Sequence, residues 1–337
     1  FDIHDSRQYK VGSIIGECGF EHLKKIQDGF IAHQPHHNPA IFMADVIHGF
    51  RTVFPVPIAQ GASFNPELTE KISEAAAKEC SAAGLHATFA PMADLCRDSR
   101  WGRVMEGTGE DVYLNSRFAE SAVKGFQGDN CGEKGRIASC VKHFAGYGGA
   151  TAGRDYNALE VGERSLAEDY LPSYHAAINA GAELVMTSFN TIDRLPATLS
   201  RKLNRDILRD KFGFEGVLIT DYNAIGETLV HGASSDKADA AQKAMNAGVD
   251  IDMMSDAYLN HLKSEVEAGR VSGATIDEAC MRVLRLKNKL GLFENPYKDG
   301  SLEAEKKYIY CDEFLNLSRR AAEETTILLK NNGILPL

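Results

Sequence analysis

Short apolar segments alternate along the chain with longer segments in which apolar residues recur at helical spacing. The apolar segments are rich in β-branched residues and are bounded by turn residues, as strands are. We predict strands at 11–15, 40–45, 86–92, 139–144, 184–190, 216–221 and 249–253. Regular alternation of strands and helices is typical of a parallel α/β fold.

Capping signals mark where the helices begin and end. Asn65 and Pro66 open a helix that closes at Gly84, with Asn at the N-cap and Pro at the first helical position. Further helices are predicted from the capping boxes Ser165–Glu168 and Thr275–Glu278, which lead to Gly181 and Gly291, and from Ser200, which leads to Gly213.

The number of strand–helix units favours a barrel over an open doubly wound sheet. An open nucleotide-binding sheet usually carries a G-x-G-x-x-G turn after its first strand, and the sequence lacks this motif. We therefore predict an α/β fold of the TIM type, a (β/α)8-like barrel whose first unit is incomplete or irregular.

The alternation of strands and helices ends near Gly291, where a polar loop begins. We predict that residues 1–291 form the barrel domain. Residues 292–337 are expected to form a C-terminal helix at about 312–330 and the start of a linker. The final segment from Ile334 to Leu337 is apolar and contains Pro, which suits a connection to another domain.

Polar residues follow the predicted strands, at the end where a barrel gathers its reactive groups. They are Asp45 and His48, Asp94, Lys142 and His143, Ser188 and Asn190, Asp221, and Asp250 and Asp252. Asp221 ends the segment GVLITDY, where a carboxylate either caps the next helix or serves as a nucleophile kept ionised by nearby cations. We favour the nucleophile, so the sequence predicts an enzyme with a polar pocket.

A densely charged loop at 97–111 contains the only tryptophan of the chain, Trp101. A charge run is ordinarily a solvated loop held by salt bridges. The expected position at the barrel rim, with an aromatic side chain among arginines and carboxylates, instead favours a surface that holds a sugar or another polyol.

Lys142 and His143 are neighbours in a predicted buried strand. Adjacent strand residues point to opposite faces, so both enter one pocket only near the strand end. A lysine in an apolar strand needs a partner and favours a site, whereas a lone histidine is more often structural. A glycine-rich loop follows and brings Arg154 towards the opening. No second ligand stands at a diagnostic distance in sequence from His143, so no metal is expected.

Composition limits the classes of partner. The 337 residues carry a formal net charge of −10, which argues against nucleic acid or an anionic membrane as the main partner. No apolar run approaches the roughly 18 residues of a membrane span. Seven dispersed cysteines without C-x-x-C fit neither a zinc site nor a disulfide scaffold, and we interpret them as small buried apolar residues.

Long motifs of the chain resemble glycoside hydrolase family 3, in particular its multidomain bacterial β-glucosidases. They are DVIHGFRTVFPVPIAQGASFNPEL at 45–68, FAPMADLCRDSRWGRVMEGTGED at 89–111, KHFAGYGGATAGRDYN at 142–157, GFEGVLITDYNAI at 213–225, VLRLKNKLGLFENPY at 283–297 and LLKNNGILPL at 328–337. Together they cover nearly the whole chain in the order of the family.

The resemblance implies a role for particular residues. Asp221 matches the nucleophilic aspartate of a retaining mechanism that passes through a glycosyl-enzyme. Positions that hold sugar hydroxyls in the first subsite, or neutralise the nucleophile, are matched by Asp45, Arg103, Lys142, His143 and Arg154. Positions that wall this subsite are matched by Met186 and Tyr222. The resemblance implies no cofactor and no metal.

The sequence does not reveal an acid/base residue. In the multidomain members this residue is a glutamate on an α/β sandwich domain that follows the LPL segment, where this sequence stops. Compact relatives use a histidine in the motif HFPGHG, but this chain reads HFAGYG, with Tyr147 in place of that histidine. The resemblance therefore implies a downstream α/β sandwich domain, covalent or on a separate chain, as a partner.

The resemblance also implies the substrate class. We expect a β-glucoside or short oligosaccharide that loses β-linked glucose from its non-reducing end, because Asp45 matches glucosidases. The alternatives are a β-xylosidase or other β-glycosidase of the family and a non-catalytic carbohydrate-binding barrel. The resemblance points to the periplasm or to secretion and leaves the cytoplasm open. The sequence specifies neither the linkage nor the oligomeric state.

Overall fold

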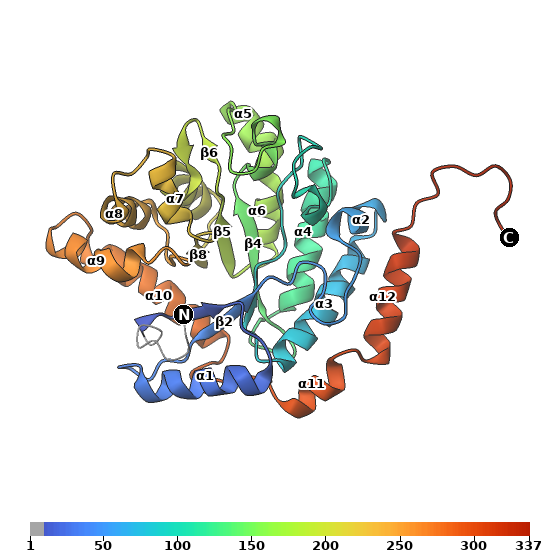
Figure 1. Cartoon of the computed structure of the whole chain (residues 1–337), viewed down its shortest axis with the longest axis horizontal. Coiled ribbons are helices and arrows are strands. Elements are labelled where there is room, and N and C mark those ends of the chain that lie inside the picture. The colour runs from blue at the N-terminus through green and yellow to red at the C-terminus, as the bar shows by residue number, and fades with distance from the viewer. Residues whose placement is uncertain (1–9) are drawn as a thin grey trace.

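A computed structural model describes residues 10–337, with residues 1–9 of the predicted barrel domain outside the described part, and contains a six-stranded parallel sheet (Figure 1). Its strands, in spatial order, are β1 Ser13–Ile15, β2 Ile41–Ala44, β3 Ala87–Thr88, β4 Ala138–Phe144, β5 Leu184–Thr187 and β8 Val217–Ile219. Beyond β8, Ile219 forms one further parallel bridge to Ile251. A separate antiparallel hairpin joins β6 Thr191–Ile192 to β7 Leu195–Pro196.

Helices follow the strands and lie outside the sheet (Figure 1). The main helices of this part are α1 Phe20–His33, α2 Pro57–Ala62, α3 Pro66–Ala82, α4 Val112–Gln127, α6 Pro172–Asn179, α7 Ala224–Val230, α8 Lys237–Ala247, α9 Ala257–Glu267 and α10 Gly273–Lys289. Shorter 3₁₀, α and π segments are η2 Val104–Glu106, η3 Tyr147–Gly149, η4 Thr151–Gly153, α5 Glu163–Ser165, η5 Leu166–Tyr170, η6 Ala197–Leu199 and η7 Lys202–Lys211.

Parallel strands that are adjacent in both sequence and space, with helices outside them, form a TIM-type barrel, so the predicted fold class is confirmed. In the described part of the chain, no pairing joins β1 to the segment at Ile251. Residues 10–337 therefore leave the barrel open next to its first strand, where the sequence predicted an incomplete or irregular unit.

Six of the seven predicted strands are observed in place, and several of them are shorter than predicted. The segment at 249–253 contributes only the bridge at Ile251. The reason is visible in side-chain hydrogen bonds that replace strand partners. The hydroxyl of Thr88, at the end of β3, accepts the backbone N–H of Val46, and the hydroxyl of Thr220 accepts that of Met253.

Two predicted helix starts are confirmed and two are wrong. The side chains of Asn65 and Ser200 each accept a backbone N–H three residues further on. The helix predicted from Thr275 instead begins after Ser272, whose hydroxyl supplies the cap earlier in the chain. The helix predicted at position 165 already begins at Glu163, without a side-chain cap.

Side chains of the sheet follow the two-residue period of a strand. One buried cluster, in the interior of the barrel, takes alternate residues: Ile41, Met43, Ala87, Phe89, Ala138, Cys140, Leu184, Met186, Val217 and Ile219. Residues between them, such as Phe42, Val141 and Leu218, pack in other clusters against the helices. The next inward positions along β2, β4 and β8 are 45, 142 and 221, so the strand period itself directs these side chains to the top of the interior.

Two helices follow the barrel, α11 Leu302–Tyr308 and α12 Asp312–Glu324. Both pack beside α3, and α12 buries Phe314 and Ala321 there (Figure 1). The predicted C-terminal helix is thus observed but ends earlier, and α11 was not predicted. The chain after α12 runs away from the barrel, with Leu329 fully exposed (Figure 1). The boundary at residue 291 stays a prediction.

All seven cysteines are unpaired, but only Cys80, Cys131 and Cys140 are buried. The interpretation of the cysteines as buried apolar residues is therefore right for three of them and wrong for the exposed Cys280. Among the helices of residues 10–337, none has both the length and the apolarity that crossing a bilayer requires.

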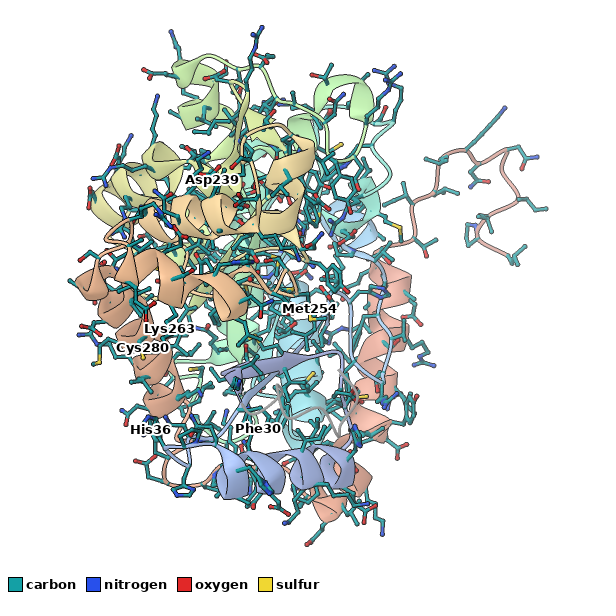
Figure 2. All side chains as sticks on the ribbon, turned by 60° about the vertical axis from the view of Figure 1, so that its left-hand side comes forward. Phe30, His36, Asp239, Met254, Lys263 and Cys280 are labelled. Atoms are coloured by element: carbon teal, nitrogen blue, oxygen red, sulfur yellow. The ribbon has the colours of Figure 1, made fainter. Side chains whose placement is uncertain are left out.

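A cavity of about 500 Å³ lies where the barrel is open. Its walls come from β1, from the segment 250–254 and from α9 and α10. Figure 2 shows this side of the molecule, with Met254 and Cys280 of the cavity wall labelled. The wall includes Asp250 and Asp252, which belong to the last strand segment, but neither Lys142 nor Asp221.

Candidate active site

Five ionisable side chains meet at the carboxyl ends of the strands, and we call them the rim cluster: Asp45, Arg103, Lys142, His143 and Asp221. Asp45 follows β2, Lys142 and His143 end β4, and Asp221 follows β8, while Arg103 comes from the loop before η2. Parallel strands end at one rim of a barrel, which is where such folds place their chemistry.

Lys142 lies inside the barrel and forms an ion pair with Asp45. Its Nζ donates to Asp45 Oδ1 at 2.6 Å, and its side chain is 5% exposed whereas that of Asp45 is 63% exposed. A buried ammonium group needs such a partner. The ammonium group of Lys142 has three N–H donors. Within the described residues it uses one of them for Asp45, so the other two are available to hydroxyl groups of a ligand.

The end of β4 directs both Lys142 and His143 into the pocket. Pairing between β4 and β5 shifts register between Val141 and Phe144. An irregularity of this kind re-aims side chains that would otherwise alternate across the sheet. Both side chains therefore reach other members of the rim cluster, although the two residues are neighbours in one strand.

His143 is buried and touches three polar groups. Its Nδ1 is 2.8 Å from Asp94 Oδ2, and its Nε2 is 3.2 Å from Arg103 Nη2 and 3.3 Å from Asp221 Oδ2. Burial lowers the pKa of His143 to about 3, the charge on Asp221 opposes this shift, and the cations Arg103 and Lys142 add to it. The imidazole is therefore neutral at physiological pH.

Asp221 keeps one oxygen free of hydrogen bonds. Its Oδ1 accepts the backbone N–H of Tyr222 at 2.6 Å, while its Oδ2 is buried and lacks a hydrogen-bond partner among residues 10–337. The side chain does not cap α7, whose N-cap residue is Asn223. Buried polar atoms are nearly always paired, so the free oxygen indicates a functional group, as the nucleophile hypothesis requires.

Arg103 is held in place by Glu106. Its Nε and Nη2 donate to the two carboxylate oxygens at 2.7 and 2.9 Å, a bidentate geometry that fixes the guanidinium plane. Burial lowers the pKa of Arg103, but the bonds and charge of Glu106 outweigh burial and raise it overall. Arg103 therefore remains a fixed cation beside His143.

Trp101 is buried beneath the charged loop, so its ring offers no exposed face on which a sugar could stack. The side chain is 2% exposed, and its Nε1–H donates to Asp155 Oδ1 at 2.8 Å. The indole meets the Tyr147 ring edge-on, with centroids 5.2 Å apart. Other arginines of the loop form ion pairs with carboxylates, so the salt-bridged interpretation holds for most of the loop.

Tyr147 cannot replace the catalytic histidine of compact relatives. Its ring is fully buried and packs edge-on against Trp101, His143 and Phe189. Burial, and after it the neighbouring carboxylate of Asp155, raises the pKa of its hydroxyl far above the ordinary value. A phenol in this state does not exchange protons at moderate pH.

In the described part of the chain, no hydrogen bond or ion pair joins the side chains of Met186, Tyr222 and Arg154 to the rim cluster, although the backbone N–H of Tyr222 donates to Asp221. Met186 is 2% exposed and belongs to the barrel interior below the rim. Tyr222 is 54% exposed beside Asp221. Arg154 is exposed after η4, and no described hydrogen bond or ion pair joins it to Asp221. Their contact with a ligand stays a prediction.

Two site residues were given no role from the sequence. Asp94 was noted only as a polar strand end, yet it holds both His143 and the hydroxyl of Tyr174. Tyr174 lies on α6, where its pattern is that of an ordinary buried helix residue. The polar position of Asp94 after β3 was the one available signal.

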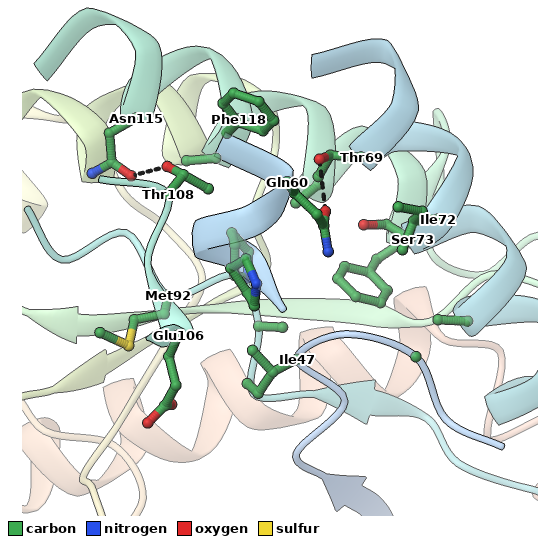
Figure 3. A pocket seen from close by; sticks show the side chains of 18 residues that line it. Ile47, Gln60, Thr69, Ile72, Ser73, Met92, Glu106, Thr108, Asn115 and Phe118 are labelled. Carbon is green, nitrogen blue, oxygen red and sulfur yellow. Dashed lines mark hydrogen bonds between the residues drawn. The ribbon is translucent and has the colours of Figure 1, made fainter. Parts of the chain in front are cut away.

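A small cavity near the charged loop is too small for a sugar ring. Its volume is about 30 Å³, and its walls come mainly from α2, α3 and α4 (Figure 3). Gln60 pairs with Thr69 and Thr108 with Asn115 along these walls, and Glu106 lies at the border (Figure 3). Such a space has room for a buried water. Within residues 10–337 no three His, Cys, Asp or Glu side chains gather in a way that could hold a metal.

Comparison with known proteins gives consistent results. The profile of the Glycosyl hydrolase family 3 N terminal domain matches residues 5–286. A periplasmic β-glucosidase of Salmonella typhimurium is 37% identical over 96% of this chain, and a putative β-xylosidase of Formosa agariphila is 35% identical over 89%. This chain covers 42% and 40% of those two proteins, respectively.

A solved structure agrees closely with the fold described above. The crystal structure of a β-glucosidase from Listeria innocua in complex with isofagomine superposes with a TM-score of 0.97 at 46% identity, over 99% of this chain and 47% of that one. The chain thus spans less than half the length of these relatives. With its barrel, its rim cluster and a profile match over most of its length, this chain belongs to glycoside hydrolase family 3.

Proposed function

We propose that this chain supplies the nucleophile and first sugar subsite of a retaining β-glycosidase that releases β-linked glucose from the non-reducing end of β-glucosides. Asp221 attacks the anomeric carbon and the glycosidic oxygen leaves, which forms a glycosyl-enzyme that water then hydrolyses. The observation that carries the proposal is Asp221 Oδ2, buried and unpaired beside Arg103 and His143 at the barrel rim.

The other rim residues bind the sugar. Lys142 donates to hydroxyls with its unused N–H groups, and the exposed carboxylate of Asp45 accepts from them. Met186 forms the floor of the subsite from the barrel interior, whereas Tyr222 and Arg154 line its edge. A short β-linked oligosaccharide extends outward from this subsite.

The acid/base carboxyl comes from an α/β sandwich domain, either downstream on the same polypeptide or on a separate one. Support comes from the length of the relatives, of which this chain covers less than half, and from the buried, unreactive state of Tyr147. In retaining enzymes the two carboxyls stand about 5–5.5 Å apart, so that domain must reach over the rim.

A β-xylosidase is the second candidate, because a relative 35% identical is a putative β-xylosidase. The two sugars differ in the hydroxymethyl group of glucose, so kcat/KM for matched aryl β-glucosides and β-xylosides separates the candidates. The similarity to a periplasmic β-glucosidase supports a periplasmic or secreted location.

The test is a mechanism-based label. A 2-deoxy-2-fluoro-β-glucoside with an activated leaving group should form a slowly hydrolysed ester on Asp221, found by mass spectrometry of peptides from the protein together with its downstream domain. Asp221→Asn should take up no label, and Asp206→Asn, at an exposed carboxylate away from the rim, should label like the wild type. An ester on another residue, or none at all, would refute the proposal.

A further inference from the structure

Asp94 is the most deeply buried carboxylate near the rim cluster. Its side chain is 0% exposed and accepts hydrogen bonds from three donors. The backbone N–H and Nδ1 of His143 approach Oδ2 at 2.9 and 2.8 Å, and the hydroxyl of Tyr174 approaches Oδ1 at 2.6 Å. Three donors of this kind are what compensates the burial of a carboxylate.

The contact with Asp94 determines which ring nitrogen of His143 carries the proton. An ionised carboxylate only accepts, so Nδ1 must be the N–H donor. Burial raises the pKa of Asp94 to about 6, while Tyr174, the backbone of His143, Arg103 and Lys142 lower it. Asp94 is therefore ionised at neutral pH and imposes the Nδ1–H tautomer.

Arg103 requires the same tautomer independently. Its guanidinium group has N–H donors and no acceptor, and its Nη2 lies 3.2 Å from Nε2 of His143. Nε2 must then present a lone pair. A proton on Nε2 would face an N–H group of Arg103 directly, so the reversed tautomer conflicts with Asp94 at Nδ1 and with Arg103 at Nε2.

This tautomer leaves the nucleophile free. Nε2 of His143 and Oδ2 of Asp221 are 3.3 Å apart, but both are acceptors and make no hydrogen bond with each other. A proton on Nε2 would instead bind Oδ2 and reduce its ability to attack carbon. The state of His143 thus decides whether the free oxygen of Asp221 stays free.

We propose that Asp94 is a positioning residue that holds His143 as its Nδ1–H tautomer and thereby keeps Oδ2 of Asp221 unpaired for attack. The proposal rests on the function proposed above for Asp221. Asp94 acts through His143 and does not touch the sugar. Tyr174 holds the second oxygen of Asp94 and fixes the orientation of the carboxylate.

The tautomer can be measured without any reaction. Nitrogen-15 NMR of the histidine-labelled protein, with the signal of His143 assigned from His143→Gln, distinguishes the two ring nitrogens. We expect a protonated Nδ1 and an unprotonated Nε2 at pH 7. Tyr174→Phe retains the acceptor for Nδ1 and should show the same tautomer. A protonated Nε2 in the wild type would overturn the proposal, whatever the activity.

Asp94→Ala removes the acceptor, and Nε2–H should then become populated and bind Asp221. The rate of labelling by the fluoroglucoside should fall about 10²-fold, as for a misplaced reacting group. Asp94→Asn restores an acceptor oxygen, so it should recover the Nδ1–H tautomer and part of the lost rate. Asp94→Ala with the wild-type tautomer and labelling rate would contradict the proposal.

The outcomes separate the two proposals. A wild type with the expected tautomer but no label on Asp221 would refute the proposed function and leave the assignment of the His143 proton standing. Labelling of Asp221 with a protonated Nε2 would refute the role of Asp94 and leave the function standing. If Asp94→Ala does not fold, the tautomer of the wild type and the partial rate of Asp94→Asn decide.

Discussion

At the scale of single residues, carboxylates outnumber cations around the rim. Lys142 and Arg103 are each matched by a carboxylate, and Asp221 is additional to these pairs. A neutral sugar gains little from this excess, but the oxocarbenium-like transition state of glycoside hydrolysis carries positive charge. In the proposed reaction, the charges of the rim would therefore favour the transition state over the bound substrate.

Replacing Lys142 tests whether binding and folding can be separated. Lys142→Met keeps a long side chain and removes a cation from a site that is 5% exposed, so stability should change little. Loss of its charged hydrogen bonds to hydroxyls, at about 1.5–3 kcal/mol, should lower kcat/KM by roughly 10–100-fold. Assays with an aryl β-glucoside and thermal unfolding of the same samples give both values. A large fall in Tm would show that Lys142 contributes mainly to the stability of the fold.

Asp94 should give stability a specific pH dependence. Burial raises its pKa from 3.8 in the unfolded chain to about 6 in the fold. The folded state therefore binds more protons between these values, so the contribution of Asp94 to stability is largest below about pH 4 and falls as the pH rises to 6.

Asp94→Asn lacks this titration. The free energy of unfolding of the wild type, relative to Asp94→Asn, should therefore decrease between about pH 4.5 and pH 7. Urea unfolding of both proteins at the two pH values measures this change. A difference that stays constant would show that Asp94 does not titrate in this range.

At the scale of elements, Asp250 connects the segment at 249–251 to η7, α10 and β8. Its carboxylate accepts from Arg209 on η7 at 2.8 Å, from Arg282 on α10 at 3.0 Å, and from the backbone N–H of Leu218 in β8 at 2.8 Å. Burial raises the pKa of Asp250 and lowers that of Arg209 to about 10. The group therefore depends on all its partners being present.

Asp250→Ala should destabilise the fold by about 3–5 kcal/mol, because it leaves buried arginines without their carboxylate. Asp206→Asn is the matched control, since Asp206 also lies on η7 but has a side chain that is 55% exposed. Urea unfolding at neutral pH measures both. A loss of stability below about 1 kcal/mol for Asp250→Ala would show that Asp250 and its arginines stabilise the fold no more than exposed ion pairs do.

The sequence predicted the elements better than their ends. Apolar β-branched segments located the strands, whereas hydroxyls such as Thr88 and Thr220 shortened them through contacts that no local pattern reveals. The rim residues Asp45, Lys142, His143 and Asp221 were predictable because the strand ends of a barrel converge, whereas Arg103 lies in a loop and was assigned to the site by the family resemblance. The link from Tyr174 through Asp94 was not, because it joins α6 to β3 and β4 in space only.

At the scale of the whole molecule, this chain brings together the proposed nucleophile and the proposed sugar-binding groups and covers less than half of its relatives. The proposed division of the catalytic carboxyls between two domains would make the first chemical step of this chain alone depend on how well the leaving group departs without a proton. A good leaving group needs no proton, and a poor one needs the acid.

This dependence gives the final prediction. The barrel chain alone should turn over 2,4-dinitrophenyl β-glucoside slowly but hardly cleave an alkyl β-glucoside, because Asp221 can attack without proton donation. Addition of the α/β sandwich domain should accelerate the alkyl substrate by about 10²–10⁴-fold, the usual contribution of general acid catalysis, and the dinitrophenyl substrate far less in the glycosylation step. Pre-steady-state release of dinitrophenol and steady-state release of glucose measure the two steps. Equal acceleration of both substrates would show that the second domain completes the sugar subsite, with the acid lying elsewhere.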